Sequence, residues 1–252
     1  MFQLPAKLSS VKICAGKRCL IEIFFKCCFR WPSHVKDSKL HCHRPIILQS
    51  TLRDVDSLIW LDIDYRLTSS DLDSWMTAAQ ESGVMAWSEI NPATTSSQQQ
   101  QQQQLAPVAT TSLTHPKMFT YFDKRKYEDY AFQHMVGLGS VILYNHEKVH
   151  QELMLPWLKC VLTEACVNPL GAQDSGCRFD KKPQFRYSGC HRYDASAFNI
   201  VLGEIFNFQE NLYLGDKTFF RKVDQNAPQQ ESGNFTDSLN TVSSESLAGL
   251  EM

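Results

Sequence analysis

Several features that would assign this chain to a broad class are missing from its sequence. No run reaches the ~18–20 consecutive apolar residues that a transmembrane helix needs. The apolar stretch 20–29 is short, contains Glu22 and Lys26, and is not followed by the small-residue cleavage site of a signal peptide. The formal net charge is −2, so no overall basic charge indicates a nucleic-acid partner. We therefore expect neither a membrane span nor nucleic-acid binding.

The nine cysteines include no pair at the C-x2-C spacing that is typical of zinc sites. Five cysteines precede residue 43, and four lie between residues 160 and 190, at Cys160, Cys166, Cys177 and Cys190. The even C-terminal set predicts two disulfides in an oxidising compartment, with three possible pairings. Free thiols in a cytosolic, zinc-binding protein are the alternative, and the tripeptide His41-Cys42-His43 is a weak metal candidate.

The length of 252 residues allows one sizeable core, or one domain with tails. Residues 1–53 show no sustained period, whereas residues 54–223 contain the periodic apolar segments of an α/β domain. A low-complexity insertion at 91–112, with the glutamine run 98–104, interrupts that domain, and residues 224–252 are predominantly polar and rich in Ser, Thr, Asn, Gln and Glu. Because neither polar segment can bury apolar surface, we expect the insertion and the tail to be disordered.

Short apolar runs and turn signals predict the elements of the domain. Residues 57–61, 84–88 and 140–144 have the length and composition of buried strands. A helix is expected between the first two strands, beginning after cap residues at 68–73 and ending at Ser82-Gly83. Further helices are expected at 127–135, 145–157 and 195–203. Strands alternating with helices indicate an α/β sheet, in which ligands bind at the carboxyl ends of the strands.

Asp62 and Asp64 follow the first predicted strand directly. Two carboxylates at positions i and i+2 can face one ligand if the chain turns there. Hard divalent cations such as Mn²⁺ and Mg²⁺ take oxygen ligands, often one or two carboxylates together with substrate phosphates. The pattern predicts a metal site at the strand edge, and a solvated turn is the plain alternative.

A second polar cluster, His191-Arg192-Tyr193-Asp194, precedes the apolar run 195–202. The run fits a buried helix, and Asp194 or Ser196 is suited to its first turn, where the helix dipole favours a carboxylate. Three side chains that can take part in chemistry, those of His191, Arg192 and Asp194, would then lie at the N-terminus of a helix that is buried in the core. The structural alternative is that Asp194 caps the helix, His191 is hydrogen-bonded internally and Arg192 pairs with a carboxylate.

Five segments together resemble a known family. They are LIWLDIDYR at 58–66, THPKMF at 114–119, LPWLKC at 155–160, GCRFDKKP at 176–183 and YSGCHRYDASA at 187–197. In these segments the chain is similar to an uncharacterised invertebrate family of glycosyltransferase-like proteins, related to nucleotide-diphospho-sugar transferases with the GT-A fold. The resemblance covers roughly residues 54–223 apart from the glutamine insertion, and it implies a Rossmann-like mixed sheet flanked by helices.

The resemblance also implies roles for particular residues. Asp62 and Asp64 match the acidic motif that holds Mn²⁺ or Mg²⁺ on a nucleotide sugar, and His191 would complete that metal site. Asp194 would be the catalytic carboxylate that accepts the proton of the acceptor hydroxyl. Cationic side chains would add positive charge near the phosphates, supplied by Arg192, Lys181 and Lys182. The implied partners are a nucleotide sugar and a glycan or protein acceptor, in the Golgi or secretory lumen.

Only about 55 residues precede the acidic motif, whereas GT-A domains place several strands and helices before it. We therefore expect a partial GT-A-like domain that is truncated or divergent. The competing hypothesis is a non-catalytic, disulfide-stabilised binding domain that keeps the fold without the donor pocket.

Overall fold

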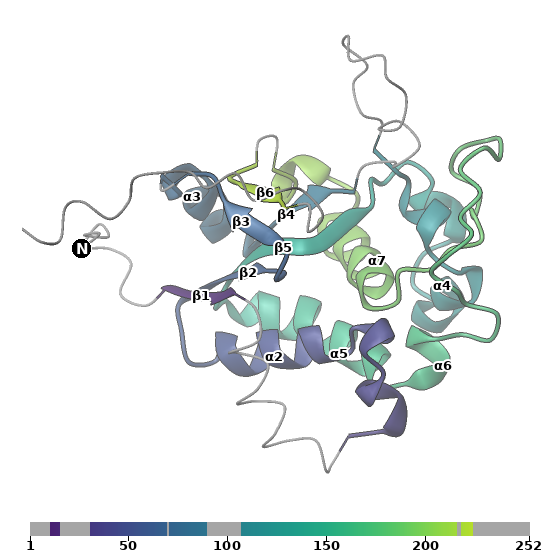
Figure 1. The fold of residues 1–252 in the computed structure, drawn as a ribbon, viewed down its shortest axis with the longest axis horizontal. Coiled ribbons are helices and arrows are strands. Elements are labelled where there is room, and N and C mark those ends of the chain that lie inside the picture. Colours follow the sequence, from purple (N-terminus) through teal and green to yellow (C-terminus); the bar gives the residue numbers. More distant parts are fainter. Residues whose placement is uncertain (1–10, 16–30, 70, 90–106, 216–217, 224–252) are drawn as a thin grey trace, which may run out of the picture.

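Six strands form two sheets in a computed structural model of the chain, which describes residues 11–15, 31–69, 71–89, 107–215 and 218–223. The larger sheet has the strand order β1-β2-β5-β4, and a two-stranded ribbon pairs β3 with β6 (Figure 1). The strands are β1 Val11–Ala15, β2 Ser57–Leu61, β3 Tyr65–Leu67, β4 Val84–Ser88, β5 Val136–Tyr144 and β6 Phe220–Lys222. The described fold is therefore mixed α/β.

The strand directions bring two chain segments to one edge of the larger sheet. Strand β1 is parallel to β2, and β5 is antiparallel to both of its neighbours, β2 and β4. Strands β2 and β4 therefore run in the same direction, although β5 lies between them. Asp62 follows the last residue of β2, and Glu89 follows the last residue of β4. The two acidic residues consequently lie at the same edge.

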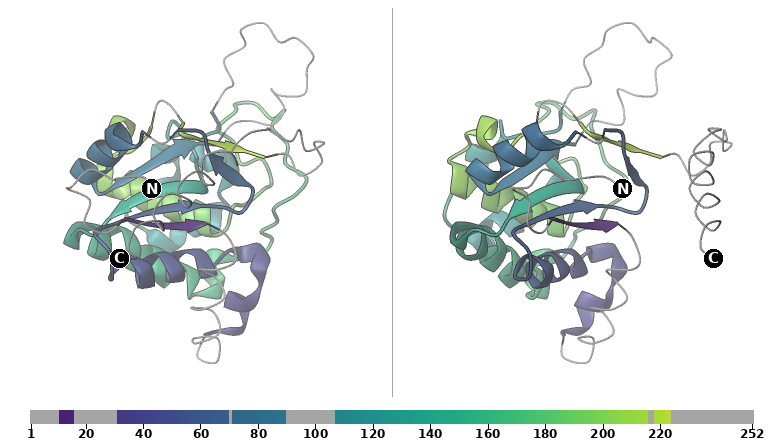
Figure 2. Two further views of the ribbon diagram at one scale, coloured as in Figure 1. Left: turned by 60° about the vertical axis from the view of Figure 1, so that its left-hand side comes forward. Right: turned by 90° about the vertical axis from the view of Figure 1, so that its left-hand side faces the viewer.

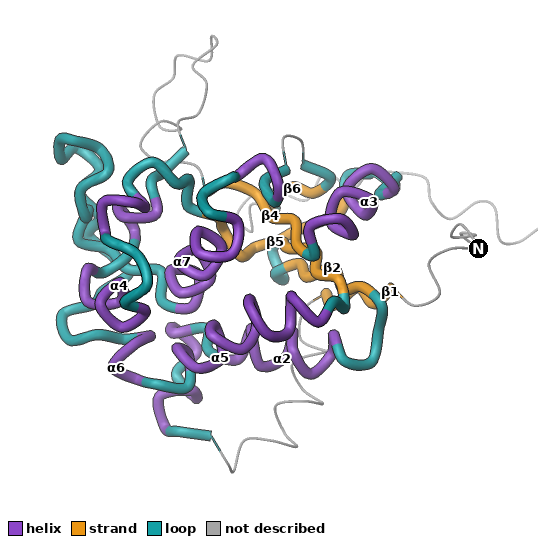
Figure 3. Tube along the Cα trace, turned by 180° about the vertical axis from the view of Figure 1, so that it is seen from behind, coloured by secondary structure: helices purple, strands orange, loops and turns teal. Residues whose placement is uncertain are grey.

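Helices cover both faces of the larger sheet, as Figures 2 and 3 show. In β2, Leu58 and Trp60 belong to the larger core, which includes residues of α2, α5 and α7. Ile59 and Leu61 belong to a smaller core on the other face, with Met76 of α3. The α-helices are α2 His43–Leu52, α3 Asp73–Ser82, α4 Pro116–Phe122, α5 Leu155–Val161, α6 Glu164–Val167 and α7 Asp194–Phe206. Because successive side chains of a strand point to opposite faces, a strand such as β2, with apolar residues at 58–61 and every residue buried, needs both layers.

Shorter helical turns join these elements. The 3₁₀ turns are η1 Ser33–Lys36, η2 Ser38–Leu40, η4 Thr110–Leu113, η5 Tyr127–Tyr130 and η7 Glu210–Leu212, and η6 Val149–Met154 is a π-helix. Within the described ranges, no helix has both the length and the apolar character needed to span a bilayer.

Most of the locally patterned elements were predicted correctly. Strands β2 and β4 have the predicted bounds, and the predicted strand 140–144 is the second half of β5. Helix α3 ends at Ser82, where Gly83 has a φ of 88° that favours glycine. Helix α7 begins at Asp194 as predicted and continues three residues beyond Gly203.

Two helix predictions need correction. The segment 127–135 is helical only in η5, because its later backbone groups bond elsewhere: Gln133 accepts from Thr110, and Met135 donates to Val108. The segment 145–157 is helical from residue 147, two residues after the predicted start. Its residues Val149–Met154 form the π-helix η6, and α5 then extends the helix to Val161.

The predicted domain boundaries were also too narrow. Residues 31–53 belong to the domain, since Ile47, Leu48 and Leu52 of α2 are buried in the larger core. The insertion predicted at 91–112 is ordered from residue 107 onward, where Thr110 and Thr111 are fully buried. Residues 90–106 and 224–252 lie outside the described ranges, so the disorder expected there stays a prediction.

The four C-terminal cysteines form two disulfides, Cys160–Cys166 and Cys177–Cys190. The prediction of two disulfides is therefore confirmed, and the structure selects one of the three pairings. These four sulfur atoms are not available as zinc ligands.

Candidate functional site

A cavity of about 740 Å³ opens at the edge where β2 and β4 end. Its floor is the segment 137–140 of β5, and the β3–β6 ribbon and the start of α7 contribute to its walls. The charged side chains that line it include four cations and four carboxylates: Arg44, Arg192, Arg221, Lys222, Asp62, Asp64, Glu89 and Asp194. The cavity therefore combines the predicted acidic motif with residues from the second predicted cluster.

Asp62 is fixed by three contacts at the carboxyl end of β2. Its backbone N–H donates to Gly139 of β5, which continues the sheet pairing by one residue. One carboxylate oxygen accepts from the indole of Trp60 at 2.8 Å, and the other accepts from Arg44 at 3.2 Å. The Asp62 side chain remains 30% exposed, so it is oriented by the protein and still accessible from the cavity.

Asp64 lies on the ribbon side of the cavity. Its carboxylate is 3.2 Å from the ammonium group of Lys222 on β6. Val223 donates its backbone N–H to the Asp64 carbonyl at 2.7 Å, which attaches the acidic turn to β6. The two carboxylates of the acidic motif thus line one cavity.

Asp194 is buried at the start of α7, and its carboxylate accepts from Arg44 at 2.5 Å. Burial raises the pKa of the Asp194 carboxyl, and the Arg44 guanidinium opposes that rise. The Asp194 carbonyl accepts from the buried indole of Trp157 at 2.9 Å. Arg44 therefore bridges Asp62 and Asp194, two residues far apart in the sequence, and connects the two predicted clusters.

The residue before Asp194 has an unfavourable backbone conformation. Tyr193 has a φ of 46°, which is rare for a bulky side chain and costs about 1–3 kcal/mol. Such strain persists only where surrounding contacts hold it, and it is concentrated at functional sites. It positions Asp194 at the junction between the loop and α7.

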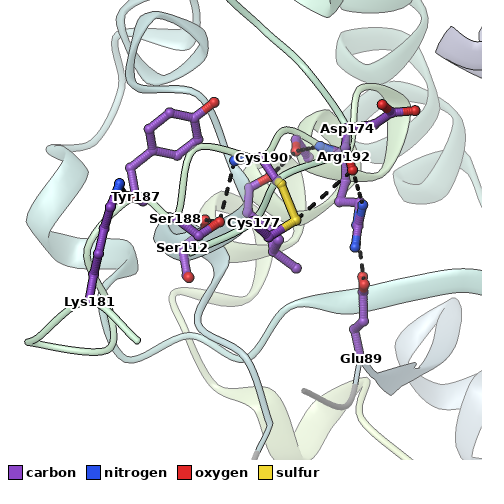
Figure 4. The surroundings of a disulfide bond; sticks show 11 residues. Glu89, Ser112, Asp174, Cys177, Lys181, Tyr187, Ser188, Cys190 and Arg192 are labelled. Atoms are coloured by element: carbon purple, nitrogen blue, oxygen red, sulfur yellow. Dashed lines mark hydrogen bonds and ion pairs between the residues drawn. A yellow bond between two sulfur atoms is a disulfide. The ribbon is translucent and has the colours of Figure 1, made fainter. Parts of the chain in front are cut away.

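Arg192 contacts the cavity from the loop that precedes α7. Its side chain donates to the Glu89 carboxylate and to the Asp174 carbonyl, each at 3.2 Å (Figure 4). The nearby disulfide Cys177–Cys190 closes the loop two residues before Arg192. Arg192 thus lines the cavity, and its pairing with a carboxylate is the structural alternative considered from the sequence; its role toward a phosphate stays a prediction.

His191 cannot be a metal ligand in this fold, so that prediction is corrected. The side chain is fully buried, and it is not among the residues that line the cavity. Its Nδ1 accepts from the backbone N–H of His115 at 3.1 Å, and its Nε2 contacts the Val167 carbonyl at 3.0 Å. Burial lowers the pKa of His191 to about 3, so the ring is neutral and joins three chain segments.

The two lysines predicted to bind phosphate also lie elsewhere. Neither Lys181 nor Lys182 lines the cavity, and the Lys181 ammonium contacts the Tyr187 carbonyl at 3.4 Å. Both belong to the loop closed by the Cys177–Cys190 disulfide, and Figure 4 shows Lys181 on the opposite side of that disulfide from Glu89.

Sequence reasoning missed Arg44 and Glu89. Arg44 lies in a segment without a clear period. The sequence feature that could have indicated a buried helix there is the apolar run that follows Pro45, near the start of α2. Glu89 was recognisable only as the residue after a predicted strand, at the position that Asp62 occupies after β2.

The donor set limits which metal the cavity can hold. In the described part of the chain, no group of three or more His, Cys, Asp or Glu side chains is arranged to hold a metal ion. Asp62 and Asp64 supply carboxylate oxygens only. This set fits a hard divalent cation whose remaining ligands are phosphates and water, as is usual for Mg²⁺.

The tripeptide His41-Cys42-His43 does not have the properties of a zinc site. Cys42 is fully buried, and burial raises the pKa of its thiol to about 12. Among the described residues, the tripeptide does not belong to any group of three or more His, Cys, Asp or Glu side chains arranged to hold a metal ion.

Comparison with known proteins found no matching family model, no matching curated protein and no matching solved structure. The cavity and its residues are therefore the features of the molecule from which a function can be inferred.

Proposed function

We propose that this chain is a glycosyltransferase-like domain of partial GT-A type, which binds a nucleotide-diphosphate sugar in the cavity at the end of β2. The observation that carries the proposal is the bridge formed by Arg44. It joins the acidic turn after β2 to the start of α7, so both predicted carboxylate clusters meet at one edge of the sheet.

Asp62 and Asp64 are the residues that would hold Mn²⁺ or Mg²⁺. When bound, such an ion would neutralise negative charge on the diphosphate leaving group. The Lys222 side chain is 67% exposed, and its ammonium group pairs with Asp64. The ammonium group can therefore move to a phosphate oxygen when a cation binds the Asp64 carboxylate. Arg221 also lines this side of the cavity.

Asp194 supports the proposal as a positioning residue. Its side chain is 1% exposed and bound to Arg44, so little of its carboxylate is available to accept a proton from an acceptor. Its role in the proposed site is to keep Arg44, and through it Asp62, in a fixed position.

The two disulfides support a lumenal location, such as the Golgi or another secretory compartment, because disulfides persist in oxidising environments. A domain that keeps the nucleotide-sugar cavity but does not transfer the sugar is the second candidate, and it differs from the binding domain without a donor pocket considered above. The pairing of the buried Asp194 carboxylate with Arg44 favours it, because that carboxylate is then not free to accept a proton.

Calorimetric titration with uridine diphosphate (UDP) and guanosine diphosphate, with and without Mn²⁺, tests the proposal. We expect Mn²⁺-dependent binding of at least one nucleotide. The double variant Asp62→Ala/Asp64→Ala should weaken it by about tenfold or more, because it removes both protein ligands of the cation. Asp54→Ala, which removes an exposed carboxylate outside the cavity, should bind like the natural chain.

Unchanged nucleotide binding in the double variant would exclude the metal role of the acidic turn. Absence of nucleotide binding in the natural chain would exclude the proposed function. Release of free nucleotide diphosphate from a nucleotide sugar, measured over time, separates a transferase from a binding domain.

A further inference from the structure

Strand β5 presents two glycines to the cavity, and they differ in what covers them. Gly137 and Gly139 both line the cavity and alternate with the buried residues Val136 and Leu138. At Gly139, a Cβ atom would lie 2.4 Å from the ring of Tyr65, so that ring covers the glycine. At Gly137, the one described side-chain or backbone atom that a Cβ atom would meet is the Cβ of Glu89, at an ordinary contact distance of 4.0 Å. The floor of the cavity is therefore open above Gly137.

An irregularity in the pairing of β4 with β5 begins next to Gly137. Ala86 of β4 lies opposite Val141, but the next residue, Trp87, lies opposite Gly137. Residues 138–140 of β5 therefore have no partner on β4, and they line the cavity instead. Bulges of this kind occur next to active sites, and glycine within a strand often marks the close approach of a ligand.

The polar groups beside Gly137 are an ion pair with accessible atoms. The Arg192 guanidinium donates to the Glu89 carboxylate at 3.2 Å, and the two side chains are 29% and 25% exposed. Figure 4 shows this pair reaching from the loop before α7 to the end of β4. A guanidinium only donates hydrogen bonds and an ionised carboxylate only accepts them. A ligand hydroxyl, which does both, can bond to either member.

The charge balance favours a neutral ligand at this position. Glu89 is matched by Arg192, and Asp194 is matched by Arg44. An anionic group placed here would meet the Glu89 carboxylate, whereas a hydroxyl group leaves the ion pair intact. The cations Lys222 and Arg221 lie on the ribbon side of the cavity, beside Asp64, where a diphosphate is better accommodated.

We propose that the space above Gly137 is a subsite for a neutral pyranose ring, with Glu89 accepting from one ring hydroxyl and Arg192 donating to another. The absence of a side chain at Gly137 lets the ring lie against the strand. This inference rests on the proposed function, because it identifies where the sugar portion of the ligand is held.

Saturation-transfer NMR with methyl pyranosides tests the subsite without nucleotide or metal. The probes are the methyl glycosides of glucose, galactose, mannose, xylose and N-acetylglucosamine. We expect saturation transfer to the ring protons of at least one probe. Gly137→Val should weaken binding of that probe by about tenfold or more, and Gly137→Ala should weaken it less, because the larger side chain fills more of the subsite.

A variant of the Glu89–Arg192 ion pair is compared with a matched control variant outside the cavity. Glu89→Ala should weaken pyranoside binding, while Glu81→Ala, which removes an exposed glutamate of α3, should leave it unchanged. Thermal unfolding of Gly137→Val is measured alongside. Since a Cβ atom at 137 meets no close neighbour, this variant should fold like the natural chain.

The same samples are titrated with UDP and Mn²⁺ so that the two proposals fail separately. Pyranoside binding that is absent, or that persists in Gly137→Val, overturns the subsite even if UDP binds. Pyranoside binding that is lost in Gly137→Val, in a chain that does not bind nucleotide, supports the subsite and excludes the proposed function.

Discussion

Asp194 and Asp64 each pair with one basic residue in the same cavity, but the two ion pairs lie in different surroundings. The side chains of Asp194 and Arg44 are 1% and 7% exposed, and their atoms are 2.5 Å apart. The side chains of Asp64 and Lys222 are 23% and 67% exposed, at 3.2 Å. The chemical groups are similar, so burial is the main difference between the pairs.

Burial determines which pair can exchange its partner. Removing one member of a buried pair leaves an uncompensated charge away from water, which typically costs about 3–5 kcal/mol. An exposed pair contributes about 0–1 kcal/mol, because water and salt screen it. The Arg44–Asp194 pair is therefore part of the framework, and the Asp64–Lys222 pair can open to admit a cation or a phosphate.

The largest expected effect comes from breaking the buried pair. Arg44→Ala should lower the free energy of unfolding by about 3–5 kcal/mol, because Asp194 then remains buried without its partner. Urea denaturation followed by tryptophan fluorescence measures the change. Arg53→Ala, at an exposed position just after α2, should change stability by no more than about 0.5 kcal/mol. A loss below about 1 kcal/mol in Arg44→Ala would show that the pair is not structural.

The loss of stability at low pH tests whether the His191 side chain is buried in its neutral form. Burial lowers its folded-state pKa to about 3, whereas the unfolded chain has the ordinary value near 6.5. The unfolded state therefore binds the proton first, and stability is lost as the pH falls from about 6.5 toward 3. The slope contributed by this one group is at most about 1.4 kcal/mol per pH unit.

Urea denaturation between pH 7 and pH 4 measures that slope, and His191→Gln should make it shallower. Burial also lowers the pKa of His43, to about 4, so part of the dependence should remain in the variant. An identical slope in the natural chain and in His191→Gln would contradict a buried neutral imidazole.

The smallest expected effect comes from the exposed pair. Lys222→Ala should change the free energy of unfolding by less than about 1 kcal/mol, because its ammonium group is mostly in water. The measurement is the same urea denaturation, repeated at low and high salt. If Lys222→Ala lowered the free energy of unfolding as much as Arg44→Ala does, the two ion pairs would not differ in their contribution to stability.

Features set by neighbouring residues were predictable from the sequence. The strands at 57–61 and 84–88 and the helix stop at Gly83 follow from apolar runs and from turn residues. The start of α7 at Asp194 follows from a carboxylate placed before an apolar run. The even cysteine set indicated two disulfides, but their pairing depends on which sulfur atoms the fold brings together.

Contacts between distant segments could not be predicted in this way. Arg44 precedes Asp194 by 150 positions, and no local pattern links an arginine in an irregular segment to a helix start. The helix expected at 127–135 did not form because its backbone groups bond to residues 108 and 110 instead.

The residue types along the chain establish that Asp62, Asp64, His191 and Asp194 are available for chemistry. Folding gives them different access to a ligand. Asp62 and Asp64 line the cavity and stay partly exposed, whereas His191 and Asp194 are almost completely buried, although Asp194 also lies at the cavity. The physical reason is that charge and hydrogen-bonding capacity belong to the side chain itself. Access to water and to ligands depends on the segments packed around it, and most of those lie far away in the sequence.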